Sequence, residues 1–170
     1  MRDIFYIFSF ATICFFILVS PSQAASGRAE IKGTNEEVAA IRGEGTFKEE
    51  KNSLHIEISV ANVWPLGQYD VSIHEFGNCA DEAKSAGQIF DVKELQESEI
   101  PVRPAGYLGT LEVAEDGTGS FKTDVLNLTL IGGPSNIAGR SIILEGKTDP
   151  ENSKSKSFSR IACGVIAITE

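Results

Sequence analysis

Apolar and polar side chains alternate along several short stretches of the chain, which is the pattern of a strand with one buried face. The clearest stretch is Leu54–Val60, where four aliphatic side chains alternate with a histidine, a glutamate and a serine. Three shorter stretches repeat the pattern and a fourth is a continuous apolar run: Val71–Ile73, Leu126–Leu130, Ile142–Leu144 and Val165–Ile168. About seven or eight short strands separated by turn residues predict an all-β fold, either an antiparallel sandwich or a barrel.

Only two segments look locally helical, Glu36–Ile41 and Lys93–Ser98, and both are short. The longest stretch without a strand pattern runs from about Gly77 to Pro104. A loop of that length in a compact domain is usually functional or held in place by a crosslink. We therefore expect this loop to have a defined role.

The first 24 residues have the order of a secretory signal peptide. Arg2 precedes an apolar run from Ile4 to Val19, and small residues stand at the −3 and −1 positions of a cleavage site after Ala24. The alternative is an uncleaved membrane anchor, although the run is shorter than the ~18–20 residues that a bilayer span needs. We expect residues 1–24 to be removed, the remainder to be exported to a periplasm or outside the cell, and no stable membrane insertion afterwards.

Composition and charge limit the possible functions of the remaining segment, residues 25–170. The whole chain has 170 residues and a formal net charge of −9, with 42% hydrophobic and 23% charged residues. This size predicts one domain, and the acidic balance argues against binding to nucleic acid. Neither a P-loop, a dinucleotide-binding fingerprint nor a CxxC motif is present.

The exported segment would keep two cysteines, Cys79 and Cys163. An even pair in an exported protein predicts one disulfide, which here would tie the long loop to the last part of the chain. For a crosslink between positions so far apart, the chain-entropy model gives a stabilisation on the order of 4 kcal/mol.

Four segments then point to a known family. Residues 73–79 read IHEFGNC, residues 85–91 read SAGQIFD, residues 138–143 read AGRSII and residues 159–166 read SRIACGVI. They resemble the HVHEFGDC, SAGPHFN, IGRT and SRLACGVI segments of the Cu/Zn superoxide dismutase family. The order and spacing agree from about Ala29 to Ile168. The resemblance implies an eight-stranded Greek-key barrel, a copper and a zinc site, and dismutation of superoxide.

The residues at the metal-ligand positions depart from that family. The resemblance places copper histidines at four positions, of which only His74 is a histidine here; the other three are Ser72, Ile89 and Glu145. On the zinc side, Pro104 and Tyr107 replace a histidine and the aspartate, and Asp149 matches an aspartate that orients ligands. The exported segment has only two histidines, His55 and His74, so one chain cannot build a site of three histidines.

Two residues, His74 and Arg160, keep more than one interpretation. His74 either approaches Glu145 at the former copper position, giving weak adventitious metal binding, or is a barrel-edge residue bonded to a neighbour such as Glu145. Arg160 matches the family's anion-guiding arginine, and we favour a stabilising role in which it donates to loop carbonyls near Cys79. His55 is expected to be an exposed histidine. Asn127-Leu128-Thr129 is a glycosylation sequon that falls in a predicted strand.

The function predicted from these observations is that of an exported, superoxide dismutase-like protein without the family's metals, acting as a non-catalytic binding or structural module. No cofactor is expected, and the partner is an unknown protein or small molecule, with a homodimer as one possibility. Two alternatives stay open: a dismutase with an atypical or intermolecular copper site, and a metal-delivery protein. The second is weakened because the exported segment lacks free Cys and Met ligands for Cu(I).

Overall fold

The computed structural model describes residues 24–92, 103–146 and 160–169. These residues form nine strands and one short 3₁₀-helix: β1 (Ser26–Gly33), β2 (Arg42–Glu49), β3 (Leu54–Ala61), β4 (Gln68–His74), η1 (Lys84–Ala86), β5 (Tyr107–Glu112), β6 (Gly119–Val125), β7 (Ser141–Gly146), β8 (Arg160–Val165) and β9 (Ala167–Thr169).

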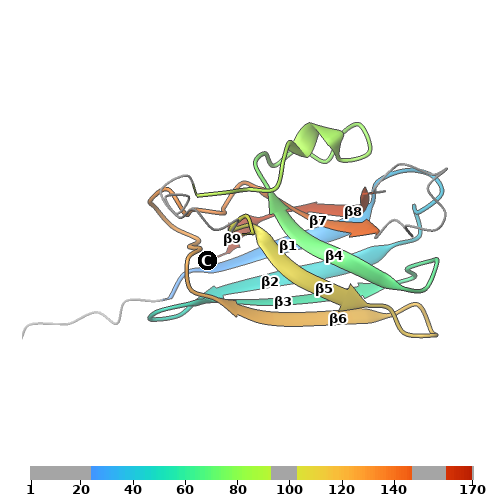
Figure 1. Cartoon of the computed structure of the whole chain (residues 1–170), viewed down its shortest axis with the longest axis horizontal. Coiled ribbons are helices and arrows are strands. Elements are labelled where there is room, and N and C mark those ends of the chain that lie inside the picture. The colour runs from blue at the N-terminus through green and yellow to red at the C-terminus, as the bar shows by residue number, and fades with distance from the viewer. Residues whose placement is uncertain (1–23, 93–102, 147–159, 170) are drawn as a thin grey trace, which may run out of the picture.

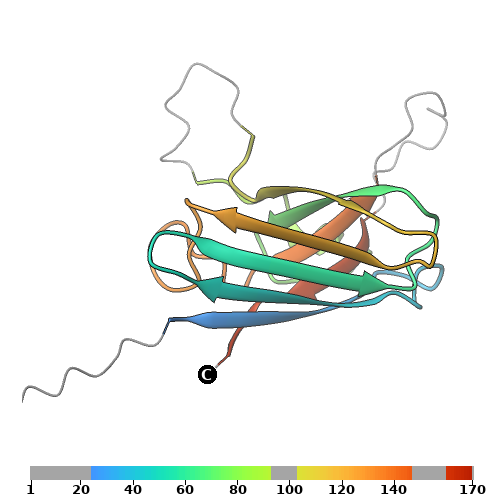
Figure 2. The same ribbon diagram turned by 90° about the horizontal axis from the view of Figure 1, so that it is seen from below.

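All the strand pairings are antiparallel, and the first eight strands follow the order β5-β4-β7-β8-β1-β2-β3-β6. The two ends of this order, β5 and β6, approach each other through an isolated bridge between Val113 and Gly119, so the barrel is nearly closed. Figure 1 shows the strands wrapped around one interior, and Figure 2 shows β1, β2, β3 and β6 side by side. The predicted all-β antiparallel barrel is confirmed.

The alternation along β3 places its aliphatic side chains inside the barrel. Leu54, Ile56 and Ile58 are at most 2% exposed and belong to the main apolar core, whereas His55 and Glu57 lie on the outside. Burying each such aliphatic side chain contributes about 1.5–3 kcal/mol, which makes this alternation the main determinant of the strand's register.

The alternation at Leu126–Leu130 was wrongly interpreted as a strand. β6 ends at Val125, and the chain continues as a bent loop. Leu128 and Leu130 are at most 2% exposed, but Leu126 is 81% exposed, so only part of the apolar pattern reflects burial. The loop instead bonds to itself, because the Thr129 N–H donates to the Ser135 carbonyl at 3.1 Å.

The predicted last strand, Val165–Ile168, is interrupted. β8 ends at Val165 and β9 begins at Ala167. The intervening Ile166 leaves the ladder because its N–H donates to the backbone carbonyl of Arg140 at 2.9 Å. Ile166 is fully buried, while Val165 and Ile168 are 41% and 47% exposed. The side chains of this apolar run are therefore partly in the core and partly on the surface.

The predicted helix at Glu36–Ile41 is a series of turns. The side-chain oxygen of Asn35 accepts the N–H groups of Glu37 and Val38, and this local bonding competes with a helix. The other predicted helix, Lys93–Ser98, lies outside the described residues. Helical structure is found instead at η1, inside the long loop after β4. No helix in the described ranges is long and apolar enough to cross a membrane.

The first strand, β1, pairs both with its neighbour in sequence and with the last two strands, β8 and β9. β1 pairs along its length with β2, and its other edge pairs with β8 at Lys32 and Gly33 and with β9 at residues 26–28. The carbonyl of Ala25, just before β1, accepts the N–H of Glu49 at 2.8 Å. Among the described residues, the hydrogen bonding of the barrel therefore extends back to Ala25.

Candidate functional site

The outer face of β4 carries two polar side chains that are sealed from solvent. Alternate residues of β4 belong to the apolar core, so Ser72 and His74 point away from the interior. Both are nevertheless buried, with 1% and 0% of their surface exposed. The loop of residues 75–92 carries η1 and rises from the end of β4 (Figure 1), and the carbonyl of its Gly87 lies within hydrogen-bond distance of His74.

Both ring nitrogens of His74 make hydrogen bonds. Nδ1 lies 3.1 Å from the carbonyl oxygen of Gly87, in the loop, and Nε2 lies 3.0 Å from the Ser72 hydroxyl. A carbonyl only accepts, so Nδ1 carries the proton and the Ser72 hydroxyl donates to Nε2. The neutral imidazole therefore links β4 to the loop and has no nitrogen left for another ligand.

Burial lowers the pKa of His74 to about 4, from 6.5 for an exposed histidine. The hydrogen bond to Gly87 opposes this effect on the pKa, the positive charge of Arg160 lowers it further, and Glu75 raises it slightly. His74 is therefore uncharged at neutral pH.

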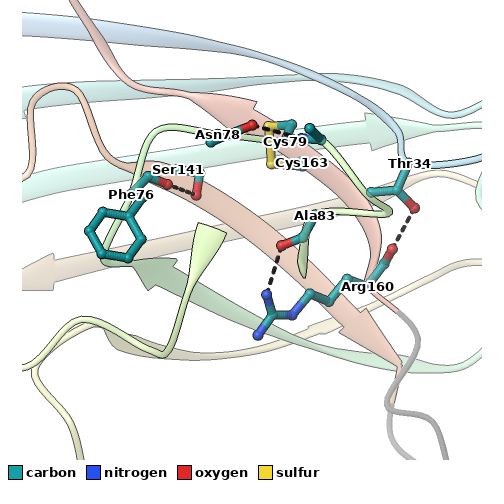
Figure 3. The surroundings of a disulfide bond; sticks show 9 residues. Thr34, Phe76, Asn78, Cys79, Ala83, Ser141, Arg160 and Cys163 are labelled. Atoms are coloured by element: carbon teal, nitrogen blue, oxygen red, sulfur yellow. Dashed lines mark hydrogen bonds between the residues drawn. A yellow bond between two sulfur atoms is a disulfide. The ribbon is translucent and has the colours of Figure 1, made fainter. Parts of the chain in front are cut away.

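Arg160, the first residue of β8, donates to the loop through both terminal nitrogens. Its two Nη atoms donate to the carbonyls of Ala83 at 2.7 Å and Gly87 at 2.9 Å, and its Nε lies 3.4 Å from a Glu145 carboxylate oxygen. Figure 3 shows the guanidinium turned towards Ala83 while the Arg160 carbonyl accepts from Thr34. Gly87 thus accepts from both Arg160 and His74.

The predicted disulfide is present and fixes the same loop to β8. Cys79 and Cys163 have their Cα atoms 5.8 Å apart and their sulfur atoms bonded (Figure 3). Cys163 also packs with Ile143, Ala83 and Ala86 in a small apolar cluster separate from the barrel core. The loop is therefore held by a covalent bond, by buried apolar contacts and by the hydrogen bonds of Arg160 and His74.

Among the described residues, no hydrogen bond joins His74 to Glu145. The register of β4 and β7 places Ser141 opposite His74 and Asp70 opposite Glu145, at the other end of the pairing. Glu145 forms its ion pair with Arg160, and both side chains are less than a fifth exposed. His74 is the last residue of β4, is fully buried, and is hydrogen-bonded to Ser72 and Gly87 rather than to Glu145.

The remaining positions of the expected metal sites lie near this face but are not grouped as ligands. Ile89 forms an isolated bridge with His74 and is half-buried. Pro104 is half-buried, and the Tyr107 hydroxyl donates to Asp70 at 3.0 Å. The guanidinium of Arg103 lies 4.5 Å from the centre of the Tyr107 ring. Asp149 lies outside the described residues.

This arrangement does not fit a copper or zinc ion. Catalytic zinc sites use three protein ligands and an open position, and a copper site of this kind would need several imidazoles. Here the Nε2 of His74 accepts a hydrogen bond from the Ser72 hydroxyl, and the carboxylate of Glu145 is paired with the guanidinium of Arg160. Across residues 24–92, 103–146 and 160–169, no three His, Cys, Asp or Glu side chains are grouped so that they could hold a metal.

Two residues that contribute to this site, one in the loop and one before β7, were not singled out by the sequence pattern. The carboxylate of Glu75 accepts the N–H of Gln88 at 3.1 Å. Arg140 donates to the Glu75 carbonyl at 2.6 Å, and its guanidinium lies 3.7 Å from the centre of the Phe90 ring. Only the position of Arg140 immediately before β7 hints at this role, since it places the guanidinium beside the loop.

His55 is not a simple exposed histidine. It is half-buried on the outside of β3, with Nδ1 2.7 Å from Asp124 and Nε2 3.1 Å from Glu57. The hydrogen bonds to these two carboxylates raise the pKa of His55, that to Asp124 most. The group is a surface ion cluster that joins β3 to β6, since Lys122 on β6 also bonds to Glu57 at 2.9 Å.

Comparison with known proteins agrees with the architecture. The family model for copper/zinc superoxide dismutase matches residues 41–166. The chain is 31% identical to the Cu-Zn superoxide dismutase of Saccharomyces cerevisiae, covering 83% of this chain and 96% of that protein. It is 28% identical to that of Onchocerca volvulus, covering 77% and 94%. It is 27% identical to an extracellular Cu-Zn superoxide dismutase of Brugia pahangi, covering 76% and 70%.

Proposed function

The chain belongs to the copper/zinc superoxide dismutase family, and from that premise we propose that it is an exported member that does not use the family's metals. In this proposal the barrel and its disulfide-held loop act as a non-catalytic binding or structural module. Export is supported by the disulfide, a bond typical of oxidising compartments, and by the similarity to an extracellular relative.

One observation is the main support for the proposal that the metals are not used. His74 is the sole histidine at the expected copper positions, and its Nε2 is hydrogen-bonded to Ser72, which stands at another of those positions. At a third position, Glu145 pairs with Arg160 instead of facing His74. Side chains that would have to release each other before binding a metal are a poor donor set.

A metal-loading experiment tests this proposal. The purified protein is incubated with Cu²⁺ and Zn²⁺ and desalted, and its metal content and superoxide dismutation are measured. We expect neither stoichiometric metal nor activity, because one histidine and one carboxylate that is already paired with Arg160 bind these ions weakly. One firmly held copper per chain, together with activity, would overturn the proposal and indicate ligands from a second chain.

The same fold provides a matched control for the loading conditions. The variant S72H/I89H/E145H places histidines at the three substituted copper positions and keeps His74. We expect this variant to retain copper after desalting under the conditions in which the parent protein does not. An active Cu-Zn superoxide dismutase treated in parallel serves as the second control, so that failure of the variant to fold leaves the result for the parent interpretable.

The proposed partner is a second copy of the chain, bound through an apolar surface beside the loop. Phe76 is 58% exposed and Val165 41% exposed. A side chain at Gly77 would come within 3.1 Å of Val165 and still closer to the Gly139 backbone, so the loop and β8 lie side by side there. Ile168, 47% exposed, follows in β9. Exposed apolar side chains grouped on one surface suit a self-complementary contact between two copies of the chain.

Charging this surface is expected to dissociate the dimer. In a symmetric interface F76E acts twice, and losing about 2 kcal/mol of apolar burial at each position raises the dissociation constant by roughly 10²–10³-fold. L126E, at an exposed leucine in another loop, is the matched control and should leave association unchanged. Sedimentation over a range of concentrations measures both variants, and a parent protein that remains monomeric would refute the dimer.

A further inference from the structure

The loop that follows β6 presents an exposed asparagine. Asn127 is exposed, two residues after the end of β6, in the bend that replaces the predicted strand. Among the described residues, nothing forms a hydrogen bond with its side-chain amide. The neighbouring Leu126 is 81% exposed. The strand that would have argued against modification at this position is therefore absent.

The two residues after Asn127 complete the sequon but belong to the folded loop. Leu128 is 2% exposed. The hydroxyl of Thr129 donates to the Gly132 carbonyl at 3.0 Å, and the Thr129 carbonyl accepts the N–H of Ile137 at 2.9 Å. In the native loop the threonine is thus engaged while the asparagine points outward. A group added to Asn127 before folding would remain outside the finished barrel.

We infer that Asn127 is the acceptor of an N-linked oligosaccharide, added while the chain is being exported and before this loop folds. Asn127-Leu128-Thr129 is the only Asn-x-Ser/Thr sequence in the chain. The inference rests on the proposed export. The sugar would be attached beside Leu126, so that a bulky polar group adjoins an exposed apolar side chain.

The chemistry is a transfer from a polyprenyl diphosphate-linked oligosaccharide. A bond forms between the side-chain nitrogen of Asn127 and C1 of the first sugar, and the bond from C1 to the diphosphate oxygen breaks. The amide loses one proton to a base of the transferase, and the polyprenyl diphosphate leaves with the bonding electrons. No electron acceptor is required, and the side-chain amide remains neutral.

Expression of the full chain in a secreting yeast tests the inference. The secreted protein is compared before and after peptide-N-glycosidase, which removes the sugar and leaves an aspartate in place of Asn127 that peptide mass spectrometry detects. We expect a single-glycan mobility shift that is lost in N127Q and T129A. The shift should persist in T129S, which keeps the hydroxyl, and in N52Q, which changes an exposed asparagine outside any sequon.

The N-terminus of the product separates the two possible failures. Secreted protein that begins at Ala25 but carries no sugar would overturn the glycosylation of Asn127 and leave export supported. Protein that stays inside the cell with residues 1–24 attached would overturn both the export and the modification. A shift that survives N127Q would also overturn the inference, because the sugar would then be attached elsewhere.

Discussion

Replacing both Cys79 and Cys163 with alanine is expected to lower the free energy of unfolding by about 4 kcal/mol or more. The disulfide joins residues 84 positions apart, and the chain-entropy model assigns about 4 kcal/mol to the restriction that such a crosslink places on the unfolded chain. The substitution also removes a buried sulfur from the small cluster formed with Ile143, Ala83 and Ala86. Urea unfolding followed by circular dichroism measures the difference.

Reduction of the unmodified protein separates these two contributions. A reductant breaks the crosslink but leaves both sulfur atoms in place, so its effect reports the covalent constraint, and any further loss in C79A/C163A reports the packing of Cys163. We expect reduction to account for most of the total. If the reduced and oxidised proteins unfold at the same urea concentration, the loop is held by its non-covalent contacts and the entropic argument fails.

Acidification is expected to destabilise the protein through His74. The folded pKa is about 4 and the unfolded pKa 6.5, so between these values the unfolded chain binds more protons than the folded one. Stability from this residue is therefore complete above pH 6.5 and decreases as the pH falls towards 4. A pKa difference of about 2.5 corresponds to about 3 kcal/mol over this range.

The variant H74Q isolates this contribution from that of the acidic residues. Its absolute stability will be lower because it disturbs the bonds to Ser72 and Gly87, but the informative quantity is the slope of stability against pH. We expect the free energy of unfolding of the parent protein to fall more steeply between pH 6.5 and 4.5 than that of H74Q. Parallel curves for the two proteins would contradict a buried neutral imidazole.

His55 provides a control of opposite sign. Its pKa is raised by Asp124 and Glu57, so the stability that it contributes is present below pH 6.5 and lost as the pH rises through the folded pKa. H55Q should therefore change the slope above pH 6.5, and it should also change the acid limb because His55 helps to lower the pKa of Glu57. The direct contributions of the two histidines to the stability profile thus fall in separate pH ranges.

Strong alternation predicted the strands that have one face in the core. β3 follows Leu54–Val60 closely, and β4 and β7 contain the pairs predicted around Val71 and Ile142. β2 carries two glycines and four charged residues, so its sequence shows no apolar alternation that would predict a strand. It is a strand because it pairs with β1 on one edge and with β3 on the other. Leu126–Leu130 is the opposite case, because its apolar and polar residues alternate as in a strand although the segment is a loop.

The candidate site was predictable as a list of residues but not as an arrangement. Cysteine count and the resemblance pointed to the disulfide, and the substituted ligand positions were evident from single residues. The pairing of Glu145 with Arg160 was not predictable, because it depends on the β4–β7 register and on a shift between Leu144 and Glu145 in the β7–β8 pairing. Nor does sequence spacing reveal that Gly87 accepts two hydrogen bonds from different strands.

The position of β1 has a consequence for the order of events during synthesis. This strand is made first, yet one of its edges pairs with β8 and β9, which are made last. Until residues 160–169 emerge, that edge has no partner from its own chain and is open to pairing with other molecules. Barrel closure and the crosslink to Cys163 both require β8, so we expect the barrel to fold only after residues 160–169 have been made. A chain truncated before β8 should accumulate as aggregate instead of as a smaller stable domain.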